Sequence, residues 1–478
     1  MLYAHGAGGH ITPSLERDSL IRRAAAVLTA AFLLTWPAIY NRYPLLYPDS
    51  TTYMIGGRPI SIALFQQRFA RYFGMRSLIY TLGIYPFHEN VTPWPIVALN
   101  ALLAAYVLWL VVRSLFPQGN IVRFLFLAGL LSLLSSLSWY VSLVMPDLLG
   151  SLAYLSIYLL VFASDTLARV ERVAVVVIAG WGAASHATHV VLAAGICVLL
   201  ACLWMLRSPP LQQRIRAVGG AAIVVAVATG CLLALHTYLY GEQTLSANMP
   251  PVLTARVIAD GPGRWYLQRH CGEAHFALCA IAGELPDSVE DFLWNPHGVW
   301  AEARKNSGDR VKREEVAFVV AVVRAYPREQ LAISAESFWQ QLATFGVRDL
   351  TAQGWVMQTI DTALPGQKTS YLRSRQFRGE MPLDFFTAVQ FWTVIASLAA
   401  TAILLPILWR AQQLRLLGLG AVIFPVVIAN ALVTGALALV EARYQSRVVW
   451  LLPFFAGVLV FHWIDRRREA ARSRGSAA

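Results

Sequence analysis

A single acid in the first half of the chain is placed to do chemistry. Asp49 lies in the segment Tyr47-Pro48-Asp49-Ser50, which directly follows the first long apolar stretch. One interpretation is a turn residue that Pro48 places in a loop. The other is a general base, because a carboxylate beside the lipid head groups can take the proton of an attacking hydroxyl. This segment alone leaves both interpretations open.

Other side chains suited to such chemistry lie at the ends of other apolar stretches. They are Tyr47, Tyr53, Arg58, Asp147, His186, His189, Glu441, Arg443 and Tyr444. Each also has a purely structural interpretation. Asp147 can stabilise a helix N-terminus, the two histidines can be satisfied at a helix break, and Arg58 can be an exposed loop charge. Glu441 and Arg443 are too close to face each other on a helix, so each can cap or snorkel by itself.

The elements that must hold these residues are membrane helices. Of the 478 residues, 57% are hydrophobic and 14% are charged, a balance that a soluble chain hardly carries. Apolar runs of about 18–24 residues cross a bilayer core as helices, and strand-like alternation is absent. The pattern predicts an all-α membrane protein with about ten transmembrane helices. They are expected at 22–41, 95–115, 122–144, 146–164, 172–187, 188–206, 217–239, 386–409, 416–440 and 447–464.

The distribution of arginine predicts the orientation. Short loops that carry arginine are expected on the cytoplasmic side with both termini, although Arg443 and Arg447 run against this trend. The net charge of +12 then reflects topology and attraction to anionic membrane lipids, and a nucleic-acid partner is not expected. No cleavable signal peptide is expected. Frequent arginine and alanine favour a bacterial inner membrane.

Two segments between the predicted spans are long. Residues 42–94 form a first outward loop, in which 60–73 have the periodicity of an amphipathic helix on the membrane surface. Residues 240–385 form a periplasmic, mainly helical insert, with helices predicted at 313–326 and 329–345. The remaining parts are a cytoplasmic segment 1–21, a transmembrane domain 22–239 that includes the catalytic first outward loop, C-terminal transmembrane helices 386–464 and a basic cytoplasmic tail 465–478.

Two cysteines in the insert admit two interpretations. In an oxidising compartment Cys271 and Cys279 can form a local disulfide. Together with His270 and His275 they can also bind zinc, although no second ligand pair is present. Neither a metal nor a cofactor is expected in the site around Asp49.

The polar residues favour chemistry at one face of the membrane. Ionisable side chains within membrane segments are costly and tend to mark function. A transporter needs polar features near the midplane, where only residues such as Asn100 and Asn430 lie, and hydrogen bonds between helices can satisfy these. An interfacial site suits a lipid-borne substrate. A transporter or flippase of a lipid-linked or small polar solute and a non-catalytic assembly protein are the alternatives.

Several short motifs resemble those of a known superfamily. The segment 47–53, followed by Gly57-Arg58-Pro59 and the amphipathic stretch, resembles the polytopic GT-C glycosyltransferases, which include protein mannosyltransferases and the aminoarabinose transferase that modifies lipid A. The motifs Met145-Pro146-Asp147, Ser185-His186 and Glu441-Ala442-Arg443-Tyr444 resemble the same group, and the resemblance covers residues 20–210 and 415–465. Many members carry two adjacent acids in the first loop, whereas Ser50 follows Asp49 here.

The resemblance implies transfer of a sugar from a polyprenyl-phosphate-linked donor to a lipid or glycan acceptor at the periplasmic face. Asp49 would be the general base, and Asp147 would orient the sugar or Asp49. Arg443 is the first candidate to stabilise the departing phosphate, followed by Arg58 and His186. The other substrate-binding candidates are Tyr47, Tyr53, His189, Glu441 and Tyr444. The rings of the three tyrosines would stack on sugars or line a lipid groove.

Overall fold

The computed structural model describes residues 13–66, 76–205, 211–241, 243–246, 249–283, 285–409 and 413–475. Within these residues every regular element is a helix, as the apolar periodicity predicts. The first half of the chain forms α1 (Pro13–Leu34), α2 (Trp36–Asn41), α3 (Pro48–Phe65), α4 (Leu78–His88), α5 (Trp94–Leu115), α6 (Asn120–Leu134), α7 (Leu137–Ser142), α8 (Asp147–Phe162), the 3₁₀ helix η1 (Ser164–Thr166), α9 (Arg169–Ala184), α10 (Ala187–Met205) and α11 (Leu211–Tyr240).

The second half begins with many short helices and ends with three long ones. The short helices are α12 (Val252–Ala259), α13 (Pro262–His270), η2 (Ala277–Ile281), α14 (Val289–Trp294), α15 (Val299–Ser307), α16 (Arg310–Ala325), α17 (Pro327–Ala343), α18 (Gly354–Ala363), α19 (Lys368–Leu372) and α20 (Arg375–Arg378). The last helices are α21 (Leu383–Trp409), α22 (Leu414–Leu437), the short α23 (Ala442–Val449) and α24 (Leu451–Gly475). Pro327 begins α17 directly after α16, as the sequence predicts for the break between them.

Five segments of the described chain are long and apolar enough to cross a membrane. They are Trp94–Leu115, Val218–Tyr240, Leu383–Leu408, Leu414–Leu437 and Ala442–Arg474. Three shorter apolar helices, Asn120–Leu134, Asp147–Phe162 and Ala187–Leu203, accompany them. These helices support the prediction of a helical membrane protein, whereas the larger predicted number of spans stays a prediction.

Helix breaks interrupt the predicted spans 122–144 and 22–41. The predicted span 122–144 is divided into α6 and α7, because the chain leaves the helix at Ser135. The first span, predicted at 22–41, is divided between α1 and α2, and Pro37 lies in the first turn of α2. Proline lacks the N–H that a continuous helix needs. The hydrophobic run alone did not reveal either break.

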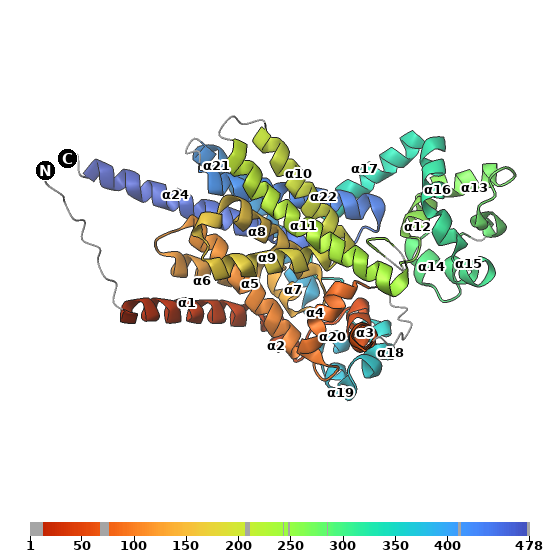
Figure 1. The fold of residues 1–478 in the computed structure, drawn as a ribbon, viewed down its shortest axis with the longest axis horizontal. Helices are drawn as coiled ribbons and strands as arrows, with labels where there is room; N and C mark the ends of the chain where they lie inside the picture. The colour runs from red at the N-terminus through yellow and green to blue at the C-terminus, as the bar shows by residue number, and fades with distance from the viewer. Residues whose placement is uncertain are drawn as a thin grey trace.

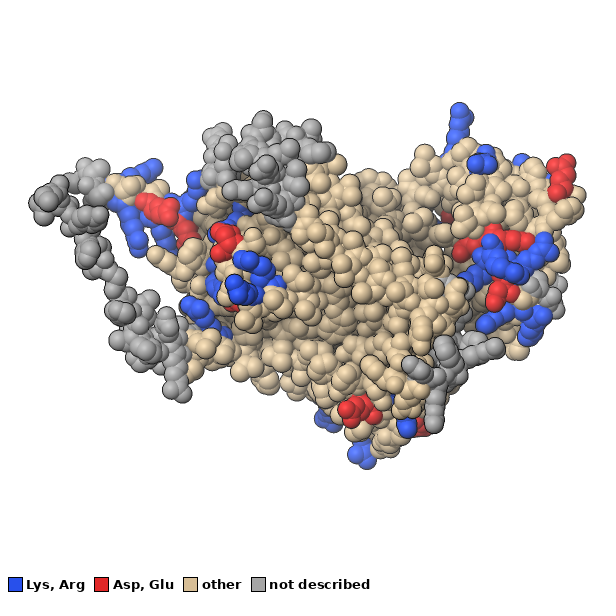
Figure 2. All heavy atoms as spheres, in the orientation of Figure 1, with Lys and Arg blue, Asp and Glu red and all other residues tan. Residues whose placement is uncertain are grey.

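The molecule is elongated (Figure 1), and charged side chains gather at its two ends and along its lower edge in the view of Figure 2. The start of α1 and the end of α24 lie at one end, and helices α12 to α16 lie at the opposite end (Figure 1). On the face shown in Figure 2, a broad band without charged side chains covers the central helices between the two ends. This distribution is what a protein that crosses a bilayer requires.

The predicted insert, residues 240–385, contributes to two different cores. Its first part surrounds a core of its own that contains Ile258, Phe292 and Phe318, and a disulfide joins Cys271 to Cys279 there. Its last part, from about residue 347, belongs to the main core instead, because α18 packs against α3. The Thr51 and Thr359 hydroxyl oxygens are 2.7 Å apart across this contact.

The predicted amphipathic helix 60–73 only partly lies within the described residues. Residues 60–65 are the last turns of α3, whereas 67–75 lie outside the described residues. Helix α3 begins twelve residues before the predicted one and contains Asp49 in its first turn. Most of the predicted first outward loop is therefore helical, with α3 and α4 packed against each other.

Candidate functional site

A short backbone pairing brings the start of α3 close to the start of α8. The Leu45 N–H donates to the Ser142 carbonyl oxygen at 2.9 Å, and the Val144 N–H donates to the Leu45 carbonyl oxygen at 3.1 Å. The buried side chain of Gln376 holds the same segment in place. Its amide accepts from the Leu46 N–H and donates to the Leu46 carbonyl oxygen. The two segments that carry Asp49 and Asp147 are thus tied together.

Asp49 lies in the first turn of a helix and is buried. Pro48 occupies the first helical position, where its missing N–H is harmless, and the Tyr47 N–H donates to the Ser50 hydroxyl at 2.9 Å. An acid in the first turn also interacts favourably with the helix dipole. The Asp49 side chain is only 12% exposed, so it is not a loop residue that points into water.

Two guanidinium groups contact the Asp49 carboxylate, one at each oxygen. Arg76 is paired with Oδ1, and Nη1 of Arg443 lies 3.4 Å from Oδ2. The Arg443 guanidinium also lies over the Tyr47 ring at 4.3 Å and the Tyr444 ring at 5.0 Å, measured to the ring centroids. We call Asp49, Arg76, Arg443, Tyr47 and Tyr444 the Asp49 cluster. Its members come from three separate segments of the chain.

Helix α23 is held at its N-terminus by groups from elsewhere in the chain. Glu441 precedes it with extended backbone, and the side-chain amide of buried Gln341 pairs with the Glu441 N–H at 3.0 Å and carbonyl oxygen at 2.8 Å. The Arg443 N–H donates to Oδ2 of Asp349 at 3.1 Å. Donors at a helix N-terminus need such acceptors, and these contacts set where the Arg443 side chain begins.

Glu441 and Arg443 were expected to be too close in sequence to face each other on a helix, yet their side chains lie close together. Their side chains approach to 3.9 Å between Oε2 of Glu441 and Nε of Arg443. The expectation assumed that both residues lie on one helix, whereas Glu441 lies outside α23. Burial raises the pKa of the Glu441 carboxyl, and the Arg443 guanidinium works against this shift.

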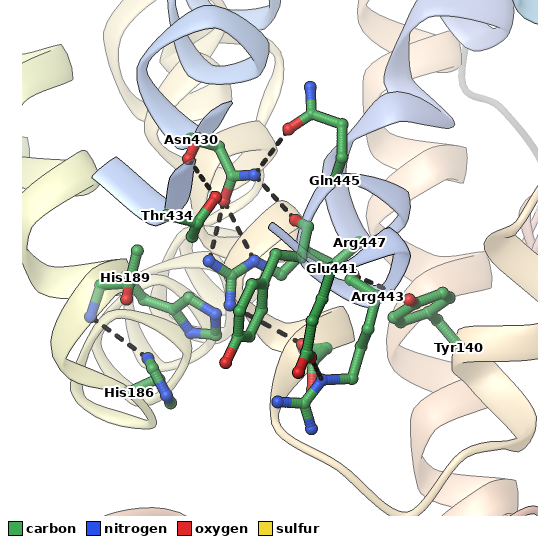
Figure 3. Close-up of polar contacts among 12 residues, drawn as sticks. Tyr140, His186, His189, Asn430, Thr434, Glu441, Arg443, Gln445 and Arg447 are labelled. Carbon is green, nitrogen blue, oxygen red and sulfur yellow. Dashed lines mark hydrogen bonds and ion pairs between the residues drawn. The ribbon is translucent and has the colours of Figure 1, made fainter. Parts of the chain in front are cut away.

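Asp147 is paired with a second arginine on the same helix as Arg443. Nη1 of Arg447 lies 3.7 Å from Oδ1 of Asp147, and both side chains are almost fully buried. Arg447 also donates to Oδ1 of Asn430 from Nε at 3.1 Å and from Nη2 at 2.8 Å (Figure 3). The Asn430 amide donates in turn to the Tyr444 carbonyl oxygen at 2.7 Å. Asn430 is therefore satisfied between helices, as the sequence predicts for this residue.

The two histidines lie beside each other at the junction of α9 and α10. Their ring centroids are 5.4 Å apart, and Figure 3 shows both at the lower left, with Asn430 above them. Nδ1 of His189 lies 3.1 Å from the Gly182 carbonyl oxygen, while its Nε2 is buried without a partner among the described residues. A Cβ on Gly150 would lie 2.7 Å from this ring, so His189 packs closely on α8.

The structure does not bring Arg58 to the Asp49 cluster. Arg58 is exposed on α3, because nine residues after Asp49 correspond to about two and a half helical turns and thus to the opposite face. Tyr53 lies about one turn after Asp49 and is buried against the Tyr80 ring, with the centroids 4.8 Å apart. The prediction of Arg58 as a phosphate ligand assumed a loop at this position.

A polar cavity of about 680 Å³ lies next to the Asp49 cluster. Tyr47 and Glu441 line it together with Glu290, Ala343, Thr344, Phe345, Arg348, Asp349, Thr351, Gln353, Thr387, Val440 and Ala442. Its volume is within the range of about 300–1,000 Å³ for small-molecule sites. It is thus large enough for a polar substrate.

Two arginines of the site were not among the residues predicted to carry it. Arg447 follows Arg443 by four residues, and this spacing places both on one face of a helix, so the signal was present. Arg76 has no comparable signal, because only the folded chain brings it to Asp49. Its guanidinium also lies 5.8 Å from the centroid of the Trp294 ring in the insert.

The site does not have the ligand set of a metal centre. Both oxygens of Asp49 face guanidinium groups, and the described residues contain no group of three or more histidine, cysteine or acidic side chains arranged to hold an ion. Carboxylate sites for divalent cations need several such ligands.

Comparison of the chain with protein families, with curated proteins and with solved structures finds no match.

Proposed function

We propose that the chain is an integral membrane glycosyltransferase of the GT-C type. It moves a sugar from a polyprenyl-phosphate-linked donor to a lipid or surface-glycan acceptor, at the periplasmic face of a bacterial inner membrane. The observation that carries this proposal is the Asp49 cluster, in which an acid and two guanidinium groups meet beside a polar cavity. About ten spans with both termini in the cytoplasm remain part of the proposal.

The reaction needs a base for the acceptor hydroxyl, and Asp49 supplies it. The acceptor oxygen forms a bond to the anomeric carbon while the bond from that carbon to the phosphate oxygen breaks. The hydroxyl proton passes to the Asp49 carboxylate, and the electron pair of the broken bond remains on the polyprenyl phosphate. A single displacement of this kind inverts the configuration at the anomeric carbon.

The phosphate needs cationic donors, and Arg76 and Arg443 supply them. Both guanidinium groups contact the Asp49 carboxylate. A phosphate competes for the same N–H groups, because arginine binds phosphate and carboxylate through similar geometry. Donor binding thus draws the arginines away from Asp49 and frees its carboxylate to accept a proton. The negative charge that grows on the phosphate in the transition state is then stabilised.

The remaining residues position this machinery. Tyr47 and Tyr444 hold the Arg443 guanidinium between their rings, and Tyr47 also faces the polar cavity. The pair Asp147 and Arg447 holds the start of α8 against α23. In this assignment Asp147 positions the site without contacting the sugar, and His186 is a further candidate donor to the phosphate.

Replacement of the proposed base tests the function. Asp49→Asn keeps the shape of the side chain but cannot accept the proton, so we expect sugar transfer to fall by about 100- to 10,000-fold. Membranes from cells that express the full chain would be given radiolabelled polyprenyl-phosphate sugars, and glycosylated lipids would be separated and identified by mass spectrometry.

The matched control is Asp361→Asn, which removes an exposed carboxyl on α18 and should leave the product unchanged. Transfer by the Asp49→Asn protein at the normal rate, with normal protein level, would overturn the assignment of Asp49. Uptake of a solute into vesicles without any covalent product would overturn the enzyme proposal as a whole.

A further inference from the structure

A second cavity, separate from the Asp49 cluster, lies where the insert meets the end of a membrane span. It has a volume of about 370 Å³ and lies between α12, α16, α17 and the last turn of α22. Its lining consists of Leu253, Arg256, Val257, Val319, Val323, Pro327, Gln330, Leu331, Ser334, Ala436 and Leu437. We call this space the α22-end cavity. None of these residues belongs to the proposed catalytic machinery.

The walls of the α22-end cavity are mainly aliphatic, and several of its side chains are exposed. Leu331 is 72% exposed, Leu437 is 52% exposed and Val323 is 39% exposed. Val316 and Val320 on α16 continue the same apolar surface. Exposed apolar surface of this extent marks a site of contact with another apolar body. Here the cavity is continuous with α22, whose candidate membrane span ends at Leu437.

The charged and polar side chains of the cavity bond to neighbouring polar groups and leave one acceptor oxygen without a partner among the described residues. Arg256 is paired with Asp260 at 3.1 Å and is bonded to the Ser337 hydroxyl. Nε2 of Gln330 donates to Oδ2 of Asp260 at 2.8 Å. This contact sets the orientation of the amide and leaves Oε1 of Gln330 buried without a partner among the described residues.

Gln330 as a whole is only 8% exposed. A buried acceptor without a donor is unfavourable, so the site is completed by a ligand that carries an O–H or N–H group beside an apolar chain.

We infer that the α22-end cavity binds one membrane lipid. The lipid places a hydrocarbon chain between α12, α16 and α17, against the last turn of α22. Its head group donates a hydrogen bond to Oε1 of Gln330. The occupant is a lipid because the cavity lies at the end of the candidate membrane span α22. The end of such a span lies at the boundary between the hydrocarbon core and the lipid head groups. The bound lipid stabilises the contact between the insert and the membrane helices, independently of the proposed sugar transfer.

Crosslinking to a lipid probe tests this inference. The purified full-length chain in nanodiscs would be irradiated with phosphatidylglycerol that carries a diazirine in its acyl chain, and the labelled peptides would be mapped by mass spectrometry. We expect labels to concentrate on residues 252–257, 319–331 and 436–437. Equal labelling of all lipid-facing helices would overturn the inference.

Two variants separate a specific site from general contact with lipid. Leu331→Trp fills the mouth of the cavity from an exposed position and should abolish the concentrated labelling. Leu432→Trp changes a similarly exposed leucine of α22 that does not line the cavity, and should leave the labelling unchanged. Persistence of the labelling in Leu331→Trp and in the second filling variant Val323→Trp would contradict the inference.

The head-group contact has its own test. Phosphatidylglycerol carries hydroxyl donors, whereas phosphatidylcholine carries none in its head group. We expect the wild-type chain to prefer the first probe by about five-fold, the equivalent of one hydrogen bond, and Gln330→Leu to lose this preference. Equal labelling of wild type by both probes would refute the proposed bond to Gln330. In Asp49→Asn the labelling should remain, so failure of the glycosyltransferase proposal is distinguishable from failure of this one.

Discussion

At the scale of single residues, the buried pair of Asp147 and Arg447 shows how the site depends on charge balance. Both side chains are at most 5% exposed, and Nη1 of Arg447 lies 3.7 Å from Oδ1 of Asp147. A buried charge that loses its partner is far more costly than a pair that is replaced by neutral groups. The two residues are therefore expected to tolerate joint replacement better than replacement of the arginine alone.

The corresponding prediction concerns stability. Arg447→Met should lower the free energy of unfolding by about 3–5 kcal/mol, because it leaves the Asp147 carboxylate buried without a counter-charge. Addition of Asp147→Asn to that variant should recover part of the loss. Unfolding of the detergent-solubilised proteins would be followed by circular dichroism. Equal stability of the single and the double variant would show that the two charges are not coupled.

At the scale of elements, the close approach of α4 to α3 depends on one glycine. A Cβ at Gly57 would lie 2.5 Å from Cδ2 of the Tyr85 ring, so the two helices can pack as they do only without a side chain at this position. Gly57→Ala should cost about 1–3 kcal/mol, as overpacking typically does.

A second substitution gives this prediction a control. Tyr85→Ala in the Gly57→Ala background should restore part of the thermal midpoint, because it removes the ring that the new methyl group meets. Gly129→Ala, where a Cβ would meet nothing within 4 Å, should be neutral. A Gly57→Ala protein with an unchanged melting temperature would mean that α4 moves freely against α3.

The start of helix α23 also depends on the buried side-chain amide of Gln341. Gln341→Leu should leave the Glu441 N–H and carbonyl group without partners, at a cost of about 1–3 kcal/mol for each group. The start of α23 and the Arg443 guanidinium should shift as a result. Loss of stability together with loss of sugar transfer would be expected. Gln340→Leu, which changes the exposed neighbouring residue, should affect neither.

At the scale of the whole molecule, the stability of the insert is expected to depend on pH. Burial raises the pKa of the Glu315 carboxyl on α16 above its usual value of 4.5, although the N–H groups of Thr254 and Leu253 oppose the shift. The folded insert therefore binds this proton more tightly than the unfolded chain. Its free energy of unfolding should increase as the pH falls toward that usual value, and decrease as the pH rises through the folded pKa.

Glu315→Gln removes this titration and keeps an acceptor oxygen for the two N–H groups. We expect the variant to show a weaker dependence of insert stability on pH between about 7 and 5. Asp260 retains a dependence of the same sign, because burial also raises the pKa of its carboxyl. Hydrogen exchange of insert amides, corrected for intrinsic rates, would measure the effect. An identical slope in wild type and variant would exclude Glu315 as its source.

Local features of the sequence were sufficient for the helices and for the type of protein. Long apolar runs predict helices that can span a bilayer, because composition and length act within one segment. Pro327 predicts the break before α17 and Pro48 favours a helix start, since both effects depend only on the proline ring. The gathering of Asp49 and Arg443 was predicted from their common position at the ends of apolar runs, although their separate chemical roles remain proposals.

Only the tertiary structure decided which charges meet. Asp49 and Arg443 are 394 residues apart in sequence, and no local pattern indicates that Arg76 takes the other carboxylate oxygen or that Arg447 pairs with Asp147. The sequence predicted Arg58 in the site because it did not show that 48–65 form one helix, on which Arg58 faces away from Asp49. The division of the insert between two cores has the same origin. Such contacts arise from packing between distant segments, which hydrophobic periodicity within one segment does not encode.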